Sequence, residues 1–363
     1  MLSTALRVLA GPRAQVRLLE RGLRPEDVRV IPAAAGGPKG LILNPLDRFI
    51  FGQWLQRTPQ NLPPTNVHLL GASIGAWRMA CACLPDADAA LAELAEDYIT
   101  QRYEHAPGKP PSARHVSEIF GRKIDERLGS RAAEVLAHPS RRLHVFTSRG
   151  RHLLARQSRW RTPLGYAGAF FANAVSRRAL GGWLERVIFS DGRDALPFAL
   201  DDFRTQQTKL DADNLAAAVL ASCSIPFWLD AVHDIPGAPK GAYWDGGITD
   251  YHLHLGYAAM ADGLVLYPHF QPSVVPGWLD KTWKSRHRAS AQLDNVVVLA
   301  PSPEWIQTLP GGKLPDRGDF KAHGDDDAGR MRIWRGALAE SQRLADEFAA
   351  LVERGSVNAE ALR

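Results

Sequence analysis

Cysteine is scarce in this sequence. Only three of the 363 residues are cysteine, namely Cys81, Cys83 and Cys223. An odd and sparse set cannot build a disulfide scaffold, and the spacing contains no CxxC pair of the kind that forms structural zinc sites. We therefore expect a chain that is held together by a hydrophobic core and works in a reducing compartment.

Long apolar runs are missing as well. The longest charge-free stretch of strong apolar character, residues 214–229, is interrupted by Ser222, Ser224 and Pro226, and it is shorter than the roughly 20 residues that a membrane-spanning helix needs. Arg7 interrupts the first apolar run of the chain, and no A-x-A cleavage pattern accompanies it, so we expect no secretory signal. These absences predict a cytoplasmic protein, with contact to membranes only at their surface.

Charge of neither sign is collected into a terminal tail. The 44 lysines and arginines are mixed with 39 aspartates and glutamates, for a net charge of +5. This mild excess suits an anionic phospholipid surface, and equally an ordinary solvated surface. Because no zinc finger, RNP motif or heptad-plus-basic region is present, we expect no nucleic-acid partner. The 45% hydrophobic content predicts an ordinary globular fold.

Two units of strand, glycine turn and helix follow one another near the N-terminus. The first consists of an apolar run at 28–35, the turn Gly36-Gly37-Pro38-Lys39-Gly40 and a helical pattern over 41–55. The second consists of the run 67–70, the turn Gly71-Ala72-Ser73-Ile74-Gly75 and a helix over 76–84. Such units predict an α/β fold, a three-layer α/β/α sandwich with a mainly parallel central sheet, whose loops at the carboxyl ends of the strands carry the chemistry.

The remaining chain extends this pattern, and we expect a single domain over residues 1–363 with a catalytic core over about 28–300. Further strands are predicted at 143–147, 186–190, 264–267 and 295–299, and further helices at 14–20, 88–103 and 215–221. Residues 104–140 are polar, basic and contain prolines, which predicts a surface insertion or lid. A strong helical pattern over 331–352 predicts a C-terminal helix that covers the sheet.

The turn from Gly71 to Gly75 matches the pattern G-x-S-x-G. In this pattern a serine sits on a sharp, strained turn between a strand and a helix, so that small residues must flank it. The N-terminus of the following helix favours negative charge that develops near the serine. Taken alone, the five residues fit a plain strand-to-helix turn as well.

Two further motifs indicate a catalytic site only when they are combined with Ser73. The backbone of Gly36 to Gly40 can bring N–H groups close to a substrate oxyanion, although an ordinary turn would look the same. The phosphate-binding pattern G-x-x-x-x-G-K-[ST] is not matched. Asp245, 172 positions after Ser73, precedes Gly246-Gly247, a combination that also occurs in simple turns.

These three motifs, in this order and setting, resemble the patatin-like phospholipase family. The stretch from Ala221 to Pro226 (ASCSIP) is also similar to a segment that precedes the aspartate in that family. Together the similarities extend over roughly residues 28 to 250. The chain departs from the family at Ala34-Ala35 before the glycine turn, at Ala76-Trp77 after the serine turn and at Asp250-Tyr251.

The resemblance implies a serine hydrolase that cleaves lipid acyl esters through an acyl-enzyme, with a Ser–Asp dyad and no metal or other cofactor. Ser73 would be the nucleophile and Asp245 the base. Backbone N–H groups within Gly36, Gly37, Pro38, Lys39 and Gly40 would form the oxyanion hole, with Lys39 adding charge or bracing the turn. Gly71 and Gly75 would form the nucleophile elbow, and Gly246 and Gly247 would support Asp245. The headgroup, acyl chain length and oligomeric state stay open.

Two alternatives remain. An α/β-hydrolase with a Ser-His-Asp triad would use one of the downstream histidines, for which His252, His254, His269 and His323 are candidates. A catalytically silent, lipid-binding member of the fold is the other. For membrane contact, the candidates are the arginine-rich residues 141–161 and tryptophans such as Trp228, Trp278, Trp283 and Trp305. A solvated face explains the arginines equally well, and ordinary packing is the better explanation for most of the tryptophans.

Overall fold

A mostly parallel sheet forms the centre of the computed structural model, which describes residues 4–57, 66–105 and 110–363. The strands are β1 (Leu6–Ala10), β2 (Val28–Ala33), β3 (Val67–Ala72), β4 (Arg141–Gly150), β5 (Leu184–Ser190), β6 (Thr205–Lys209), β7 (Val232–His233), β8 (Ala242–Trp244), β9 (Leu264–Pro268), β10 (Val296–Pro301) and β11 (Glu360–Ala361). Their order is β11-β1-β10-β9-β2-β3-β4-β5-β6, and β8 pairs with β4 and β7. The five strands from β10 to β4 in this order are parallel, whereas β1 and β5 run antiparallel to their neighbours β10 and β4.

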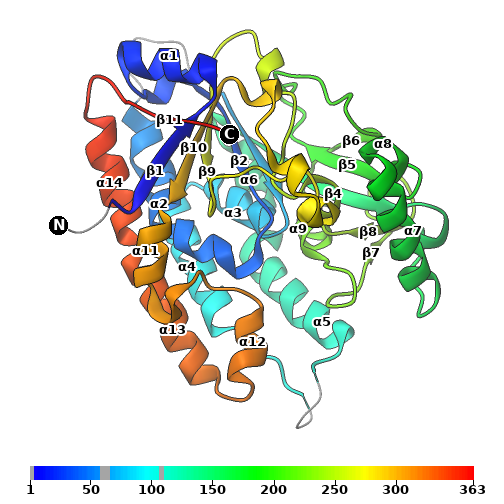
Figure 1. The fold of residues 1–363 in the computed structure, drawn as a ribbon. Helices are drawn as coiled ribbons and strands as arrows, with labels where there is room; N and C mark the ends of the chain where they lie inside the picture. The colour runs from blue at the N-terminus through cyan, green and yellow to red at the C-terminus, as the bar shows by residue number, and fades with distance from the viewer. Residues whose placement is uncertain (1–3, 58–65, 106–109) are drawn as a thin grey trace.

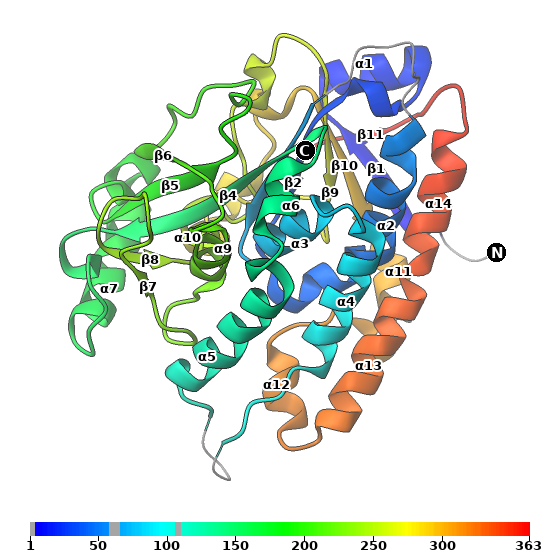
Figure 2. The same cartoon turned by 180° about the vertical axis from the view of Figure 1, so that it is seen from behind.

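Helices surround this sheet (Figure 1). They are α1 (Pro12–Arg21), α2 (Asn44–Gly52), α3 (Ile74–Ala82), α4 (Ala87–Thr100), α5 (Ala113–Ile124), α6 (Ala132–Ala137), α7 (Arg161–Val175), α8 (Arg177–Leu180), α9 (Leu215–Cys223), α10 (Gly247–Asp250), α11 (Pro303–Thr308), α12 (Gly318–His323), α13 (Asp327–Glu340) and α14 (Gln342–Val352). In both whole-molecule views α13 and α14 run along one side of the molecule, and α7 lies on the opposite side next to β7 and β8 (Figure 2). The expected α/β class with a mainly parallel sheet is confirmed.

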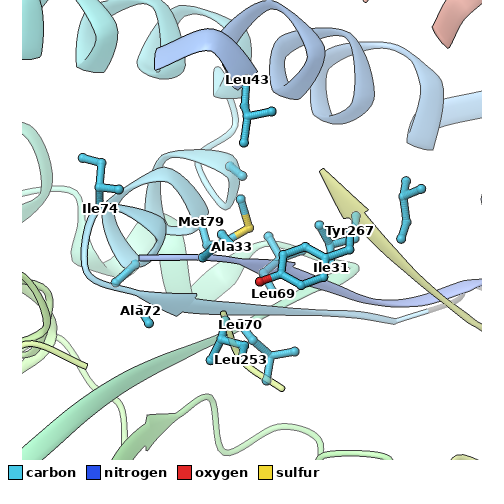
Figure 3. Close-up of a cluster of buried hydrophobic side chains, with 14 of the residues drawn as sticks. Ile31, Ala33, Leu43, Leu69, Leu70, Ala72, Ile74, Met79, Leu253 and Tyr267 are labelled. Atoms are coloured by element: carbon cyan, nitrogen blue, oxygen red, sulfur yellow. The ribbon is translucent and has the colours of Figure 1, made fainter. Parts of the chain in front are cut away.

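The central strands are apolar throughout because both of their faces are covered. Every residue of β3 is buried, as expected for a parallel strand between two layers. Leu43 and Met79 lie on one side of the strands, and Leu70 and Leu253 lie on the other (Figure 3). Helix α3 packs on β2 and β3, with α4 beside it and α2 beside α4, while the segment after Asp250 contributes Leu253 to the second face.

Several elements differ from the sequence prediction. Strand β1 was not expected, because it is short and ends directly at Gly11, ahead of α1. The helix expected over 41–55 begins with a 3-10 turn over Gly37–Leu43 before α2. The helix expected over 331–352 is two helices, α13 and α14, with Ser341 between them.

The segment 104–140 is more ordered than its polar composition suggests. Outside residues 106–109, which lie beyond the described part, it contains α5, a π-helical turn over Asp125–Gly129 and α6. Phe120, Ile124 and Leu128 are buried in the main core, so the basic residues form an outer face on helices that pack inward. Its role as a lid stays a prediction.

Candidate active site

The turn after β3 is as tightly packed as the G-x-S-x-G pattern demands. A Cβ atom at Gly71 would lie 2.3 Å from the Cα of Ala76, and one at Gly75 would lie 2.0 Å from the carbonyl oxygen of Ala33. Any side chain at either position would therefore collide with backbone. Between them Ser73 has φ 57° and ψ −132° at the start of α3, a region that residues with a side chain rarely occupy.

Ser73 and Asp245 meet although 172 positions separate them. The Ser73 hydroxyl donates a hydrogen bond to Oδ2 of Asp245 over 2.6 Å. Both side chains are buried, with only 3% and 5% of their surfaces exposed. A short hydrogen bond to a largely buried carboxylate is the arrangement by which a carboxylate can take a proton from a hydroxyl.

Two serines of the segment Ala221–Pro226 hold Ser73 and Asp245 in place. The hydroxyl of Ser222 accepts a hydrogen bond from the backbone N–H of Ser73 over 2.9 Å and donates one to the carbonyl of Phe146 over 2.7 Å. The carbonyl of Ser224 accepts the N–H of Asp245 over 2.9 Å. Ser222 and Ser224 therefore link the end of α9 to both turns.

Burial raises the pKa of Asp245 to about 6. Removal from water penalises the carboxylate, while the hydrogen bond from Ser73 and the positive charge of Arg317 oppose this effect. The N–H of Gly247 donates to Oδ1 over 2.7 Å. A carboxylate with a pKa near 6 is a stronger base than an ordinary aspartate and is still ionised at neutral pH.

The glycine turn after β2 lies against the same site. A Cβ at Gly36 would lie 2.4 Å from the ring of Phe270, and Gly37 has φ 58°, so both positions require glycine. Gly40 is different, because the nearest atom to a Cβ there would be 3.6 Å away. Within the described residues, the N–H groups of Gly37 and Ile74 donate to no protein acceptor, and both residues line the cavity at Ser73.

Three cations surround the pair. Lys39, Lys281 and Arg317 line a hollow of about 170 Å³ together with Ser73 and Asp245. Burial lowers the pKa of Lys39. The Lys281 side chain is exposed as a whole, but partial desolvation of its ammonium group at the hollow, together with the charges of Lys39 and Arg317, lowers its pKa to about 7. None of the three has a carboxylate within ion-pair distance in the described part of the chain, so their positive charge is available to a ligand.

A larger cavity of about 740 Å³ opens from Ser73 in another direction. Its walls come from α5, from the segment after α4, from residues 223–229 and from α12, and they include Val116, Ile119 and Phe120. Trp77, which follows the elbow, lies behind this wall with its ring edge-on to Phe120 at 5.3 Å. This volume is typical of pockets that enclose small organic ligands.

The candidate triad histidines have other partners. Nδ1 of His252 accepts the N–H of Val275 over 2.9 Å, and His269 packs against it in the core, where burial lowers the pKa of His269 to about 3. His254 lies 3.2 Å from the hydroxyl of Ser290, and His323 faces Asp326. None of these contacts involves Ser73 or Asp245.

Metal ligands do not gather within residues 4–57, 66–105 and 110–363. No group of three or more histidine, cysteine, aspartate or glutamate side chains there is arranged to hold an ion. Cys81, Cys83 and Cys223 are buried and free, and burial raises the pKa of each thiol. In the same ranges no helix is both long and apolar enough to cross a bilayer.

A family model described as Patatin-like phospholipase matches residues 67–252, just over half of the chain. The chain belongs to the patatin-like phospholipase family. The matched region contains Ser73 and Asp245, and membership indicates lipid acyl hydrolysis as the general activity. No curated protein sequence matches this patatin-like chain.

Two residues of the site escaped the sequence reasoning. Lys281 and Arg317 lie beyond the region that resembles the family, and no motif singles them out among the 44 lysines and arginines. Only the tertiary structure brings them to Ser73. Among the arginines of 141–161, Arg141 and Arg142 are buried and bind backbone carbonyls, so these two cannot contact headgroups and do not form a solvated face. Trp305 is also fully buried.

Proposed function

We propose that this protein hydrolyses lipid acyl esters through an acyl-enzyme on Ser73, with Asp245 as the only proton acceptor of the nucleophile. The observation that carries the proposal is the 2.6 Å hydrogen bond between the two buried side chains. The raised pKa of Asp245 supports it, because a base with a pKa of about 6 is ionised and effective at neutral pH.

In the first half-reaction Ser73 Oγ attacks the ester carbonyl carbon while its proton passes to Asp245. The tetrahedral intermediate collapses, the alcohol leaves with the proton from Asp245, and the acyl group stays on Oγ. In the second half-reaction a water molecule attacks this acyl ester and gives its proton to Asp245. Collapse then releases the fatty acid and returns the proton to Ser73.

The oxyanion of both intermediates would be held by backbone N–H groups. Those of Gly37 and Ile74 lack protein acceptors and border the cavity at Ser73. The N-terminus of α3 adds its partial positive charge at the same place. Loss of one such donor typically lowers kcat about 100- to 1000-fold.

Each of the two hollows would hold a different part of the substrate. The 740 Å³ cavity with Val116, Ile119 and Phe120 accepts an apolar acyl chain. The 170 Å³ hollow with Lys39, Lys281 and Arg317 accepts an anionic alcohol portion, such as a glycerophosphate. The arrangement favours a phospholipid over a neutral glyceride.

Labelling with a fluorophosphonate and hydrolysis of p-nitrophenyl esters test the proposal. Ser73→Ala should abolish labelling, and Ser73→Ala and Asp245→Asn should each lower kcat/KM about 10⁴-fold or more. Ser290→Ala, which changes an exposed serine, serves as the matched control and should label normally. An active Asp245→Asn enzyme, or loss of activity in His254→Gln or His323→Gln, would support a triad instead. A wild-type protein that neither labels nor hydrolyses any ester would favour the silent lipid-binding alternative.

A further inference from the structure

Helix α7 carries large apolar side chains on its outside. Trp160, Leu164, Phe171 and Val175 are 72%, 64%, 70% and 81% exposed, and with the exposed Phe170 they form what is called here the α7 face. The buried positions of the helix are mostly small or polar, namely Thr162, Gly165, Tyr166, Ala169 and Asn173. A helix between a protein and water normally shows the opposite arrangement.

The packing of α7 enforces this orientation. A Cβ at Gly165 would lie 2.6 Å from the side chain of Leu154, and one at Gly168 would lie 2.4 Å from the ring of Trp183. The helix therefore approaches its neighbours along a glycine surface that no larger side chain can occupy. Rotation that buried Phe171 would require a gap that the fold does not contain, so the α7 face stays outside.

Positive charge flanks the α7 face at both ends. Residues 135–184 contain nine arginines and no aspartate or glutamate. Arg159 and Arg161 lie at the start of α7, and Arg178 lies just beyond its end. All three are exposed, and they make no ion pair with any described carboxylate. The surface is thus apolar at its centre and cationic at its rim.

Two exposed aromatic residues, Phe227 and Trp228, lie between α7 and the 740 Å³ cavity at Ser73. The ring of Phe227, which is 60% exposed, lies 5.8 Å from that of Tyr166 in α7. Its neighbour Trp228 is 51% exposed and lines the cavity that contains Ser73. Both whole-molecule views place α7 next to β7 and β8, of which β8 leads directly into Asp245 (Figures 1 and 2).

We propose that the α7 face, with Phe227 and Trp228, docks the protein on a membrane surface that contains anionic lipid. Apolar side chains enter the boundary between headgroups and acyl chains, and the arginines at the rim contact the phosphates. A second copy of the chain is a poorer occupant. Antiparallel pairing of two α7 helices would place Arg159 and Arg161 opposite Arg178, where like charges repel.

Vesicle flotation of the full chain tests this docking. The protein carries Ser73→Ala, so the result is independent of the proposed catalysis. We expect it to bind vesicles of equimolar phosphatidylcholine and phosphatidylglycerol, and to bind pure phosphatidylcholine far more weakly. Phe171→Ser with Val175→Ser should weaken binding about tenfold or more, because two large apolar groups no longer leave water.

A matched control changes Val16 and Leu19 of α1 to serine, since these residues are exposed to a similar degree on another surface; its binding should equal that of the parent. A second variant, Arg159→Gln with Arg161→Gln and Arg178→Gln, should lose about fivefold in affinity per arginine at low salt, while Arg332→Gln with Arg354→Gln should lose much less. If the α7 variant fails to fold, the arginine variant still tests whether the α7 face binds the anionic vesicles.

Three results would overturn the proposal. One is a parent protein that stays with the buffer in the presence of the anionic vesicles. Another is equal binding by the parent and both surface variants. The third is a parent that sediments as a dimer without vesicles and becomes a monomer when Phe171 and Val175 are changed, since a second copy would then cover the α7 face.

Discussion

At the scale of single residues, Asp245 combines a proposed catalytic role with a cost to stability. Its carboxylate is buried and its pKa is raised from 3.8 to about 6. Below the pKa that Asp245 has in the unfolded protein, its carboxyl group is protonated in both the folded and the unfolded state, so its burial carries no penalty for a charge. As the pH rises from about 4 to 6, the unfolded state ionises first, so stability falls, by about 3 kcal/mol for a shift of about two pKa units.

Asp245→Asn should therefore stabilise the protein at pH 8 by up to about 3 kcal/mol while it abolishes activity. The gain should vanish near pH 4. Urea unfolding of both proteins at the two pH values measures the difference. Asp213→Asn, at an exposed position, is the control and should show no such pH dependence. Equal stability of Asp245→Asn and wild type at pH 8 would mean that the folded state does not penalise the Asp245 carboxylate.

Lys281 gives the second prediction at this scale. With the pKa of Asp245 at about 6 and that of Lys281 at about 7, kcat/KM for an anionic ester should rise through pH 6 and fall above pH 7. The fall reflects loss of the ammonium charge that binds the anion. A neutral ester should show the rise and then a plateau.

Lys281→Met should remove the upper limb of this pH profile and reduce the preference for anionic esters. Lys284→Met, a change of a nearby lysine that does not line the hollow, should leave the profile intact. An unaltered upper limb in Lys281→Met would assign the fall above pH 7 to another group.

At the scale of elements, the strand-turn-helix units depend on glycines that cannot be replaced. Gly75→Ala would place a methyl group 2.0 Å from the carbonyl of Ala33, so α3 could no longer pack against β2. We expect a loss of at least about 3 kcal/mol, or failure to fold. Thermal and urea unfolding give the measurement.

Gly40→Ala is the matched control, because its Cβ would meet nothing nearer than 3.6 Å. It lies in the helical turn before α2, where alanine is favoured over glycine, so stability should change by less than about 1 kcal/mol. Equal effects of Gly75→Ala and Gly40→Ala would contradict the steric account of the elbow.

A contact between two elements explains Asp250, one of the positions at which the chain departs from the family pattern. Asp250, at the end of α10, binds the buried Arg186 of β5, and Arg186 also binds Asp202. Arg186 has none of its side chain exposed, so its charge needs these partners. The sequence showed Asp250 only as an unusual residue after the Asp-Gly-Gly motif, because its partner lies 64 positions away.

At the scale of the whole molecule, we propose that residues 1–363 fold as one cooperative domain. Phe348 of the C-terminal α14 packs edge-on against Trp54 at 5.3 Å and Phe49 at 6.0 Å, close to α2. The N-terminal β1 pairs with both β10 and β11. The two ends of the chain thus complete the same core.

Phe348→Ala should lower the free energy of unfolding by about 3 to 5 kcal/mol and shift a single transition without splitting it. Calorimetry and urea unfolding followed by fluorescence measure both effects. Leu19→Ala, at an exposed site on α1, should change stability by less than about 0.5 kcal/mol. A separate early transition in Phe348→Ala would show that α14 unfolds independently of the sheet.

The sequence by itself determined the fold class and the identity of the two residues proposed for catalysis. Apolar strands and obligatory glycines are local requirements, so Gly71, Gly75 and the Asp-Gly-Gly motif can be read from neighbouring residues. Strand β1 was missed because five residues beside a helix give little periodic signal. Its place in the sheet depends on pairing with β10, almost 300 positions away.

Only the tertiary structure decided which charges surround Ser73 and which apolar side chains remain outside. Lys281 and Arg317 reach the site by long-range packing that leaves no local pattern. No element was predicted for residues 161–175, and the glycines on the buried side of α7 leave Phe171 and Val175 exposed on the other side. The physical reason is the same in both cases: distant segments, not sequence neighbours, determine the surroundings of a side chain.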